Sequence, residues 1–160
     1  MRLTRTSTWS SRGFTVEQLY RHELDRTTHP DMQSFLAPLK RSDGRGLVLR
    51  NQRTGAVVAS QLLPALDSET RRTGLLKHTG LPEGAAMLIA PTNAIHTFFM
   101  KFEIDVAFVR RDGRIVKIRP AMPAWRMSAA WGGHAVVEMA AGSFERAGTR
   151  AGDTLVIEAS

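Results

Sequence analysis

Short apolar runs separated by polar segments dominate the chain from Gly46 onward. Many of these runs carry β-branched side chains, and runs of this length bounded by turn-forming residues are typical of strands. The pattern predicts strands at Leu47–Leu49, Ala56–Leu63, Met87–Ala90, Ile104–Val109, Arg114–Ile118, Ala135–Met139 and Thr154–Glu158.

Two turn signals indicate how some of these strands pair. Arg53-Thr54-Gly55 can connect the first two runs as a hairpin. Asp112-Gly113 is the strongest hairpin signal in the chain, because both of its residues tolerate a positive φ. Both turns predict antiparallel pairing of the strands that flank them.

Helix-starting residues interrupt the strands at two places. Asp67 or Ser68 can cap a helix that runs to about His78, and Ser143 can cap a short helix that ends at Gly148. Strands and helices together predict a single α+β domain around an antiparallel sheet over residues 46–160.

Residues 1–45 form an N-terminal extension with one predicted amphipathic helix. Thr15 can cap this helix, and the segment Val16–Asp25 places its apolar residues on one face. Such a helix can dock on its own domain, or it can act as an arm for a partner or a second copy. The segment Lys40–Gly46, rich in charge and glycine, predicts a linker or an exposed turn.

Four motifs follow one another in the second part of the chain. They are Thr70-Arg71-Arg72-Thr73-Gly74-Leu75-Leu76, Phe98-Phe99-Met100-Lys101, Ile104-Asp105 with Asp112-Gly113-Arg114-Ile115-Val116, and Val137-Glu138-Met139 with Ala141-Gly142 and Gly152-Asp153. In this order they resemble the signature of the domain of unknown function 192 family, also called uncharacterised protein family 0127, over roughly residues 47–158. Leu76 departs from that signature, which has Met there. The resemblance supports a barrel-like sheet with two or three short helices and implies no established activity.

Composition excludes several kinds of chemistry. The chain has no cysteine, which rules out disulfides, thiolate zinc sites and cysteine nucleophiles. Its five histidines show neither helical i, i+4 pairing nor an HExxH pattern, so no metal site is predicted. Gly132-Gly133 lacks the context of a phosphate-binding loop, and no cofactor is predicted.

Charge and hydropathy narrow the classes of partner. The net charge of +7 is spread along the chain, whereas a nucleic-acid reader gathers its basic residues on one face and interleaves stacking aromatics. A nucleic-acid partner is therefore not favoured. No apolar run approaches the ~18 residues of a membrane span. Since residues 1–12 also lack the apolar core of a secretory signal, we expect a soluble, cytoplasmic protein.

Asp105 is the first candidate for chemistry, because a carboxylate inside an apolar strand must be hydrogen-bonded, paired or facing a cavity. Strand alternation places it on one face with Glu103 and Ala107. His96 is the histidine expected in the same region, and the two could act as a base and its orienting partner. A structural role for each is the competing interpretation, since no activated nucleophile accompanies them.

The connection Pro120–Gly133 is the second candidate, because long loops that carry large aromatic residues often line binding surfaces. Trp125 could stack on a flat or apolar ligand, while Arg126 holds an anionic group. Alternatively the loop folds over the core and buries its aromatic residues. The predicted ligand-binding residues are Phe99, Lys101, Asp105, Trp125 and Arg126.

These observations favour a non-catalytic binding domain for a small molecule or a protein segment. The alternative is a hydrolase-like enzyme that uses His96 and Asp105, and a nucleic-acid accessory role ranks third. Whether the protein is an enzyme stays open at the level of sequence.

Overall fold

The computed structural model describes residues 34–76 and 78–160, which form a mostly β structure with two short α-helices. The strands are β1 (Leu47–Asn51), β2 (Val57–Ala59), β3 (Gln61–Ala65), β4 (Ala85–Ile89), β5 (Ala94–His96), β6 (Ile104–Val109), β7 (Ile115–Met122), β8 (Met127–Ala129), β9 (Ala135–Ala140) and β10 (Leu155–Ala159). The helical elements are the 3-10 helix η1 (Leu39–Arg41) and the α-helices α2 (Ser68–Thr73) and α3 (Ser143–Arg146).

The strands form three sheets within the described residues, in the orders β10-β1-β2, β3-β4-β9-β6-β7 and β5-β8. All pairs are antiparallel except β3 with β4, which corrects the expectation of a wholly antiparallel sheet. Parallel neighbours need a long crossover, and the segment with α2 between β3 and β4 provides it. No closed barrel forms among these strands, so the barrel-like arrangement is not confirmed.

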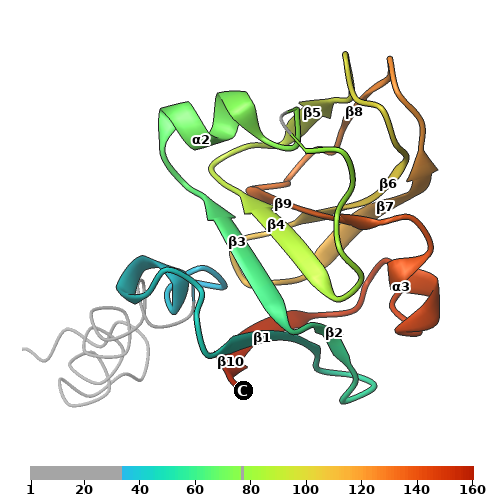
Figure 1. Ribbon diagram of the computed structural model, residues 1–160. Coiled ribbons are helices and arrows are strands. Elements are labelled where there is room, and N and C mark those ends of the chain that lie inside the picture. The colour runs from blue at the N-terminus through green and yellow to red at the C-terminus, as the bar shows by residue number, and fades with distance from the viewer. Residues whose placement is uncertain (1–33, 77) are drawn as a thin grey trace, which may run out of the picture. The chain divides into compact units, whose positions relative to one another are not determined.

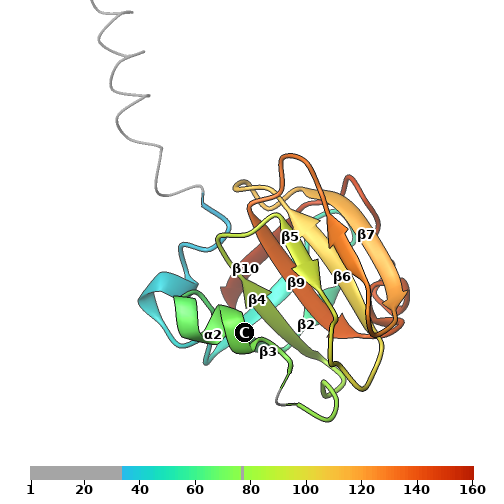
Figure 2. The same ribbon diagram turned by 90° about the horizontal axis from the view of Figure 1, so that it is seen from above.

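The five-stranded sheet carries an apolar cluster on each face. In Figure 1, β1, β2 and β10 lie below this sheet, and α2, β5 and β8 lie above it. Seen from above, α2 lies beside β3 and β4, and β5 crosses over the central strands (Figure 2). The strands β4, β6 and β9 are consequently buried on both faces, which explains their almost continuous apolar sequences.

The predicted run Ala56–Leu63 is two strands and not one. Ser60 separates β2 from β3, and the amides of Ser60 and Gln61 both donate to the carbonyl of Gly84, at 2.9 and 3.1 Å. The chain passes at this point from the three-stranded sheet to the five-stranded sheet.

The segment Pro120–Gly133 is likewise not one long loop. β7 continues through Pro120 to Met122, which is possible because β7 is an edge strand and part of its backbone needs no ladder partner. β8 then pairs with β5 and places Met127 opposite His96. Neither β5 nor β8 was predicted, since three residues are too few to show a periodicity.

Both predicted short helices exist, with shifted boundaries. Asp67 caps α2 as predicted, because its Oδ1 accepts the amides of Glu69 and Thr70 at 2.9 Å. α2 ends at Thr73 instead of near His78, since the chain turns at Gly74 with a φ of 44°. Within the described residues, no helix is long and apolar enough to cross a membrane.

The predicted cap of α3 was wrong. Gly142 occupies the capping position with a φ of 81°, and the side chain of Ser143 makes no capping hydrogen bond. The amide of Phe144 instead donates to the Oδ2 of Asp105 at 3.1 Å. A side chain from a distant strand thus satisfies the first turn of this helix.

The Asp112-Gly113 turn connects β6 to β7 as predicted. The turn is a three-residue loop, closed by a hydrogen bond of 2.9 Å from the amide of Arg110 to the carbonyl of Arg114. Of its two signal residues, Gly113 alone therefore takes a positive φ, 87°. The carbonyl of Gly113 accepts the amide of Leu155 at 2.9 Å. The hairpin of the five-stranded sheet is therefore tied to β10 of the three-stranded sheet.

The described part of the front segment packs on the domain. Phe35, Leu36 and Leu39 are buried in the apolar cluster between the two larger sheets. The helix predicted at Val16–Asp25 lies outside the described residues.

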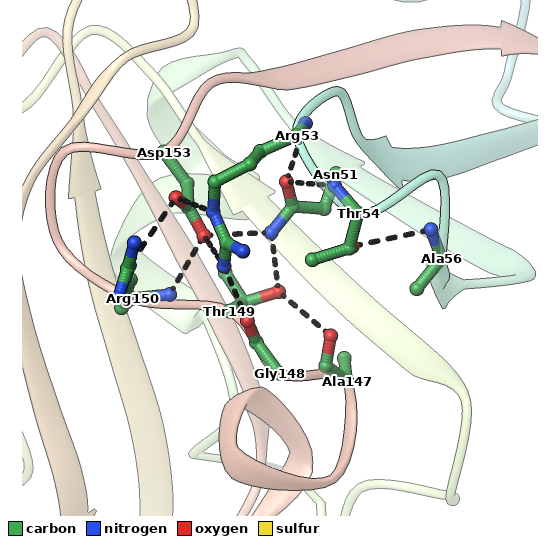
Figure 3. Close-up of polar contacts among 9 residues, drawn as sticks. All are labelled: Asn51, Arg53, Thr54, Ala56, Ala147, Gly148, Thr149, Arg150 and Asp153. Atoms are coloured by element: carbon green, nitrogen blue, oxygen red, sulfur yellow. Dashed lines mark hydrogen bonds and ion pairs between the residues drawn. The ribbon is translucent and has the colours of Figure 1, made fainter.

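A polar cluster around Asp153 ties the β1–β2 turn to the loop before β10 (Figure 3). The carboxylate accepts the Nε and Nη2 of Arg53 at 2.6 and 2.9 Å, the Nδ2 of Asn51 at 2.8 Å and the amide of Arg150 at 3.0 Å. The bond from Arg53 is the largest cause that holds the pKa of Asp153 well below its usual range. Both oxygens of this carboxylate thus accept hydrogen bonds from within the fold.

Replacing Asp153 with Asn is expected to cost about 3 kcal/mol of stability at pH 7, because the cluster loses its negative charge and one of its two acceptor oxygens. The lowered pKa means that the contribution is fully present above the unfolded-state pKa of about 4 and is lost progressively as the pH falls from there through the much lower pKa of the folded state. Urea denaturation at pH 7 and pH 3 measures this difference. Asp43→Asn, in an exposed ion pair with Arg45, is the control and should cost little.

Candidate functional site

A cavity of about 320 Å³ opens on the outer face of the five-stranded sheet, beneath α2 and β5. Its walls come from α2 and the residues after it, from the end of β4 and the following loop, and from β5. The lining residues are Arg71, Arg72, Thr73, Gly74, Leu75, Leu76, Ile89, Pro91, Thr92, Ala94, Ile95, His96, Met100 and Glu138.

Strand alternation in β9 places Glu138 on this face. Val137 and Met139 point to the cluster shared with the three-stranded sheet, so Glu138 between them faces the other way. Its cross-strand neighbours are Met87 on β4 and Val106 on β6, and both belong to the outer apolar cluster. A carboxyl group therefore sits in the middle of an apolar sheet face.

The Glu138 carboxyl is buried, with 4% of the residue exposed, and no described residue gives it a hydrogen bond or an ion pair. Burial raises the pKa of this carboxyl to about 7, because its charged form loses the stabilisation by water. An acid of this kind is rare in a core unless a ligand or a reaction uses it.

The mouth of the cavity carries the positive groups. The Nη1 of Arg71 donates to the carbonyls of Leu66 and Ala90 at 2.9 and 3.2 Å, which fixes that guanidinium on the backbone. Arg72 and His96 are exposed. The cavity thus combines a buried acid, without a partner among the described residues, with basic side chains at its rim.

A row of aromatic rings starts at this rim, which we call the aromatic row: His96, Phe98, Trp125 and Phe99. The His96 ring stacks on Phe98 at 5.0 Å between centroids, Phe98 lies 5.9 Å from Trp125, and Trp125 meets Phe99 edge to face at 4.7 Å. Phe99 is 69% exposed and Trp125 is 56% exposed. Exposed rings held in fixed geometry are unusual outside binding surfaces.

The backbone presents these rings through an unusual conformation. Phe99 and Trp125 have positive φ values of 66° and 62°. The buried Thr97 holds both segments, since its carbonyl accepts the amide of Trp125 at 3.0 Å and its Oγ1 accepts the amide of Arg126 at 3.0 Å. Non-glycine residues in this region of φ are strained, and such strain gathers at functional sites.

The structure separates the predicted site residues into two groups. Phe99 and Trp125 lie together in the aromatic row, with Arg126 exposed beside them, and Lys101 is also exposed. Asp105 is 1% exposed, does not line the cavity, and uses both oxygens to accept backbone amides, from Ala121 at 2.9 Å and Phe144 at 3.1 Å. This arrangement is that of a structural carboxylate.

Sequence reasoning did not select Glu138 as a site residue. The same signal that pointed to Asp105, one acid inside an apolar strand, is present in Ala135–Ala140. Of the two acids, the one without backbone partners lines the cavity. Among the residues that the structure describes, no three acidic or histidine side chains gather as a metal site.

Residues 49–157 match the model of the family DUF192, whose description reads "Uncharacterized ACR". No curated protein is significantly similar to the chain. Among solved structures, a protein from Sinorhizobium meliloti 1021, provisionally described as a transcription regulator, is 21% identical, with a TM-score of 0.60 over 68% of this chain and 89% of that one. A protein of unknown function from Novosphingobium aromaticivorans DSM 12444 is 22% identical, with a TM-score of 0.59 over 68% of this chain and 81% of that one. At these identities the likeness concerns the fold alone.

Proposed function

The chain belongs to the DUF192 family, and on that premise we propose that it is a small-molecule-binding domain whose site is the cavity floored by Glu138. One observation carries the proposal: a buried carboxyl without a partner among the described residues lines an open cavity. Ligand sites are commonly apolar pockets with a few convergent polar groups, and a volume of about 320 Å³ is in their range.

The energetics of Glu138 support the proposal. A raised pKa in the folded state means that ionisation of this group opposes folding at neutral pH and above. A leucine or glutamine at this position would satisfy packing without that penalty. Residues that cost stability are typical of functional sites.

The aromatic row gives the ligand a second contact. His96 lines the cavity and also starts the row, so a ligand seated on Glu138 can extend over Phe98 and Trp125. The binding role predicted for Phe99, Lys101, Trp125 and Arg126 is retained here as the outer part of the site. A flat or apolar ligand portion fits these rings.

A catalytic alternative rests on the same cavity. A carboxyl with a pKa of about 7 can both give and accept a proton near neutral pH, and His96 lines the cavity with it. The acid of such a reaction would be Glu138, because Asp105 is occupied by backbone amides. Turnover of a bound ligand that stops in Glu138→Gln would favour this alternative.

A fragment screen by two-dimensional amide NMR tests the proposal. Hits are expected to shift the amides of cavity-lining residues and to raise the melting temperature, since a ligand at about 100 times its dissociation constant adds about 2.7 kcal/mol. Ala94→Trp places an indole at the mouth and should abolish these shifts. The control Ala129→Trp changes the exposed cross-strand partner of Ala94, which does not line the cavity. If the hits cause the same amide shifts in Ala94→Trp as in the parent, the proposed site is refuted.

Glu138→Gln is expected to stabilise the protein at pH 8 by on the order of 3 kcal/mol, because the amide cannot ionise in the apolar site. The sign follows from the raised pKa of Glu138. Its contribution to the stability of the parent is fully present below the unfolded-state pKa near 4.5 and is lost as the pH rises through the folded-state pKa of about 7. The gain should therefore vanish near pH 4. Urea titrations across this range measure it, with the exposed Glu145→Gln as the control. If Glu138→Gln is no more stable than the parent at pH 8, the interpretation of Glu138 as an acid whose ionisation costs stability is contradicted.

A further inference from the structure

We infer that the ligand of this cavity carries a protonated amine that pairs with the Glu138 carboxylate, attached to a small apolar body. The inference rests on the proposed function and names the class of ligand that the cavity recognises.

Within the part of the chain that the structure describes, the floor of the cavity has no counter-charge for the Glu138 carboxylate. Glu138 is flanked across the sheet by Met87 and Val106, and the cavity lining also includes the apolar side chains of Leu75, Ile89 and Met100. An ionised carboxylate in such surroundings is costly unless an opposite charge is brought to it. A ligand ammonium group brings that charge and can donate up to three hydrogen bonds.

The described charged groups near the cavity do not supply this counter-charge. Among the residues that the structure describes, the basic residues that line the cavity are Arg71, Arg72 and His96, and the cross-strand neighbours of Glu138 on β4 and β6 are apolar. The guanidinium of Arg71 is held on two backbone carbonyls, and Arg72 and His96 are exposed at the rim. Because the basic side chains lie at the mouth, a cationic group of the ligand is expected to bind at the floor, next to Glu138. The outer part of the ligand, near the mouth, is expected to be anionic or aromatic.

Binding of an amine is coupled to the proton of Glu138. The ammonium group pairs with the ionised carboxylate, so binding below neutral pH must first expel a proton. A neutral ligand such as an alcohol can instead accept a hydrogen bond from the O–H of the protonated acid, and binding of that kind has the opposite pH dependence. The sign of the pH dependence therefore distinguishes the two classes of ligand.

Titration with three probes of similar shape tests which class of ligand the cavity binds. The probes are benzylamine, benzyl alcohol and benzoate, and each is titrated by amide NMR at pH 6 and pH 8. Benzylamine is expected to shift the cavity-lining amides and to bind about tenfold more tightly at pH 8, because the ionised fraction of a group with a pKa near 7 changes by that factor. Glu138→Gln should weaken the binding of benzylamine by tenfold or more at pH 8 and should remove the pH dependence of that binding. Glu145→Gln should leave the affinity and its pH dependence unchanged.

The outcomes separate the two proposals. If benzyl alcohol or benzoate shifts the cavity-lining amides and benzylamine does not, the amine inference is overturned and the binding cavity stands. If benzylamine binds equally well to Glu138→Gln, the pairing is overturned. If none of the three probes and no fragment of the screen shifts these amides, both the inference and the proposed function fail.

Discussion

Replacing Gly113 with valine is expected to remove more than about 4 kcal/mol of stability and to leave the protein largely unfolded near 37 °C. The backbone at Gly113 has a φ of 87°, which a β-branched residue resists. A Cβ atom at this position would also lie 2.2 Å from the carbonyl oxygen of Leu155, which is backbone and cannot rotate away. The hydrogen bond between Leu155 and Gly113 that ties the two larger sheets would break.

Gly55→Val is the matched control for this substitution. Gly55 lies in the β1–β2 hairpin with a φ of 72°, but a Cβ atom there would meet no atom within 4 Å. It should show only the conformational cost, on the order of 1–2 kcal/mol. Melting curves of both variants measure the difference. Equal losses would mean that the contact with β10 is unimportant.

Replacing Asp105 with asparagine is expected to cost about 2–3 kcal/mol, although the side chain keeps its shape. Both carboxylate oxygens accept buried amides, from Ala121 and Phe144. An asparagine offers one acceptor, and its NH₂ group would face the second amide and leave that amide without a partner. Either β7 or α3 would then lose its side-chain hydrogen bond to β6.

Asp112→Asn is the control for this prediction. The Oδ1 of Asp112 accepts one exposed amide, that of Arg114 at 3.0 Å, and the asparagine oxygen can do the same. Thermal unfolding with a fragment titration at the cavity separates stability from binding. An Asp105→Asn variant with parental stability and altered binding would return Asp105 to the functional site.

Parts of the fold follow from local sequence, and others depend on distant segments. The strand Ile104–Val109 and the turn at Gly113 were predicted, because a short apolar run and turn-forming residues are features of a few neighbouring residues. The parallel pairing of β3 with β4 was not, since it depends on the path of a long crossover.

The candidate site shows the same division. Asp105 and Glu138 give identical sequence signals, one acid in an apolar strand, yet only the first meets backbone amides. Those amides come from β7 and α3, which no local pattern brings together. The positive φ of Trp125 cannot be read from local sequence either, because the amides of Trp125 and Arg126 donate to Thr97, which lies 29 positions before Arg126.

The pairing of β1 with β10 has a consequence for biosynthesis. All five residues of β1 pair with β10, and the ion pair that Arg50 forms with Glu158 joins residues 108 positions apart. At typical elongation rates of 5–20 residues per second, the β1 edge waits several seconds or more in the nascent chain before its partner is made. An unpaired apolar edge is a template for aggregation, and pairing over such a separation is slow. We therefore expect the domain to fold only after β10 has left the ribosome, and to depend on chaperones until then.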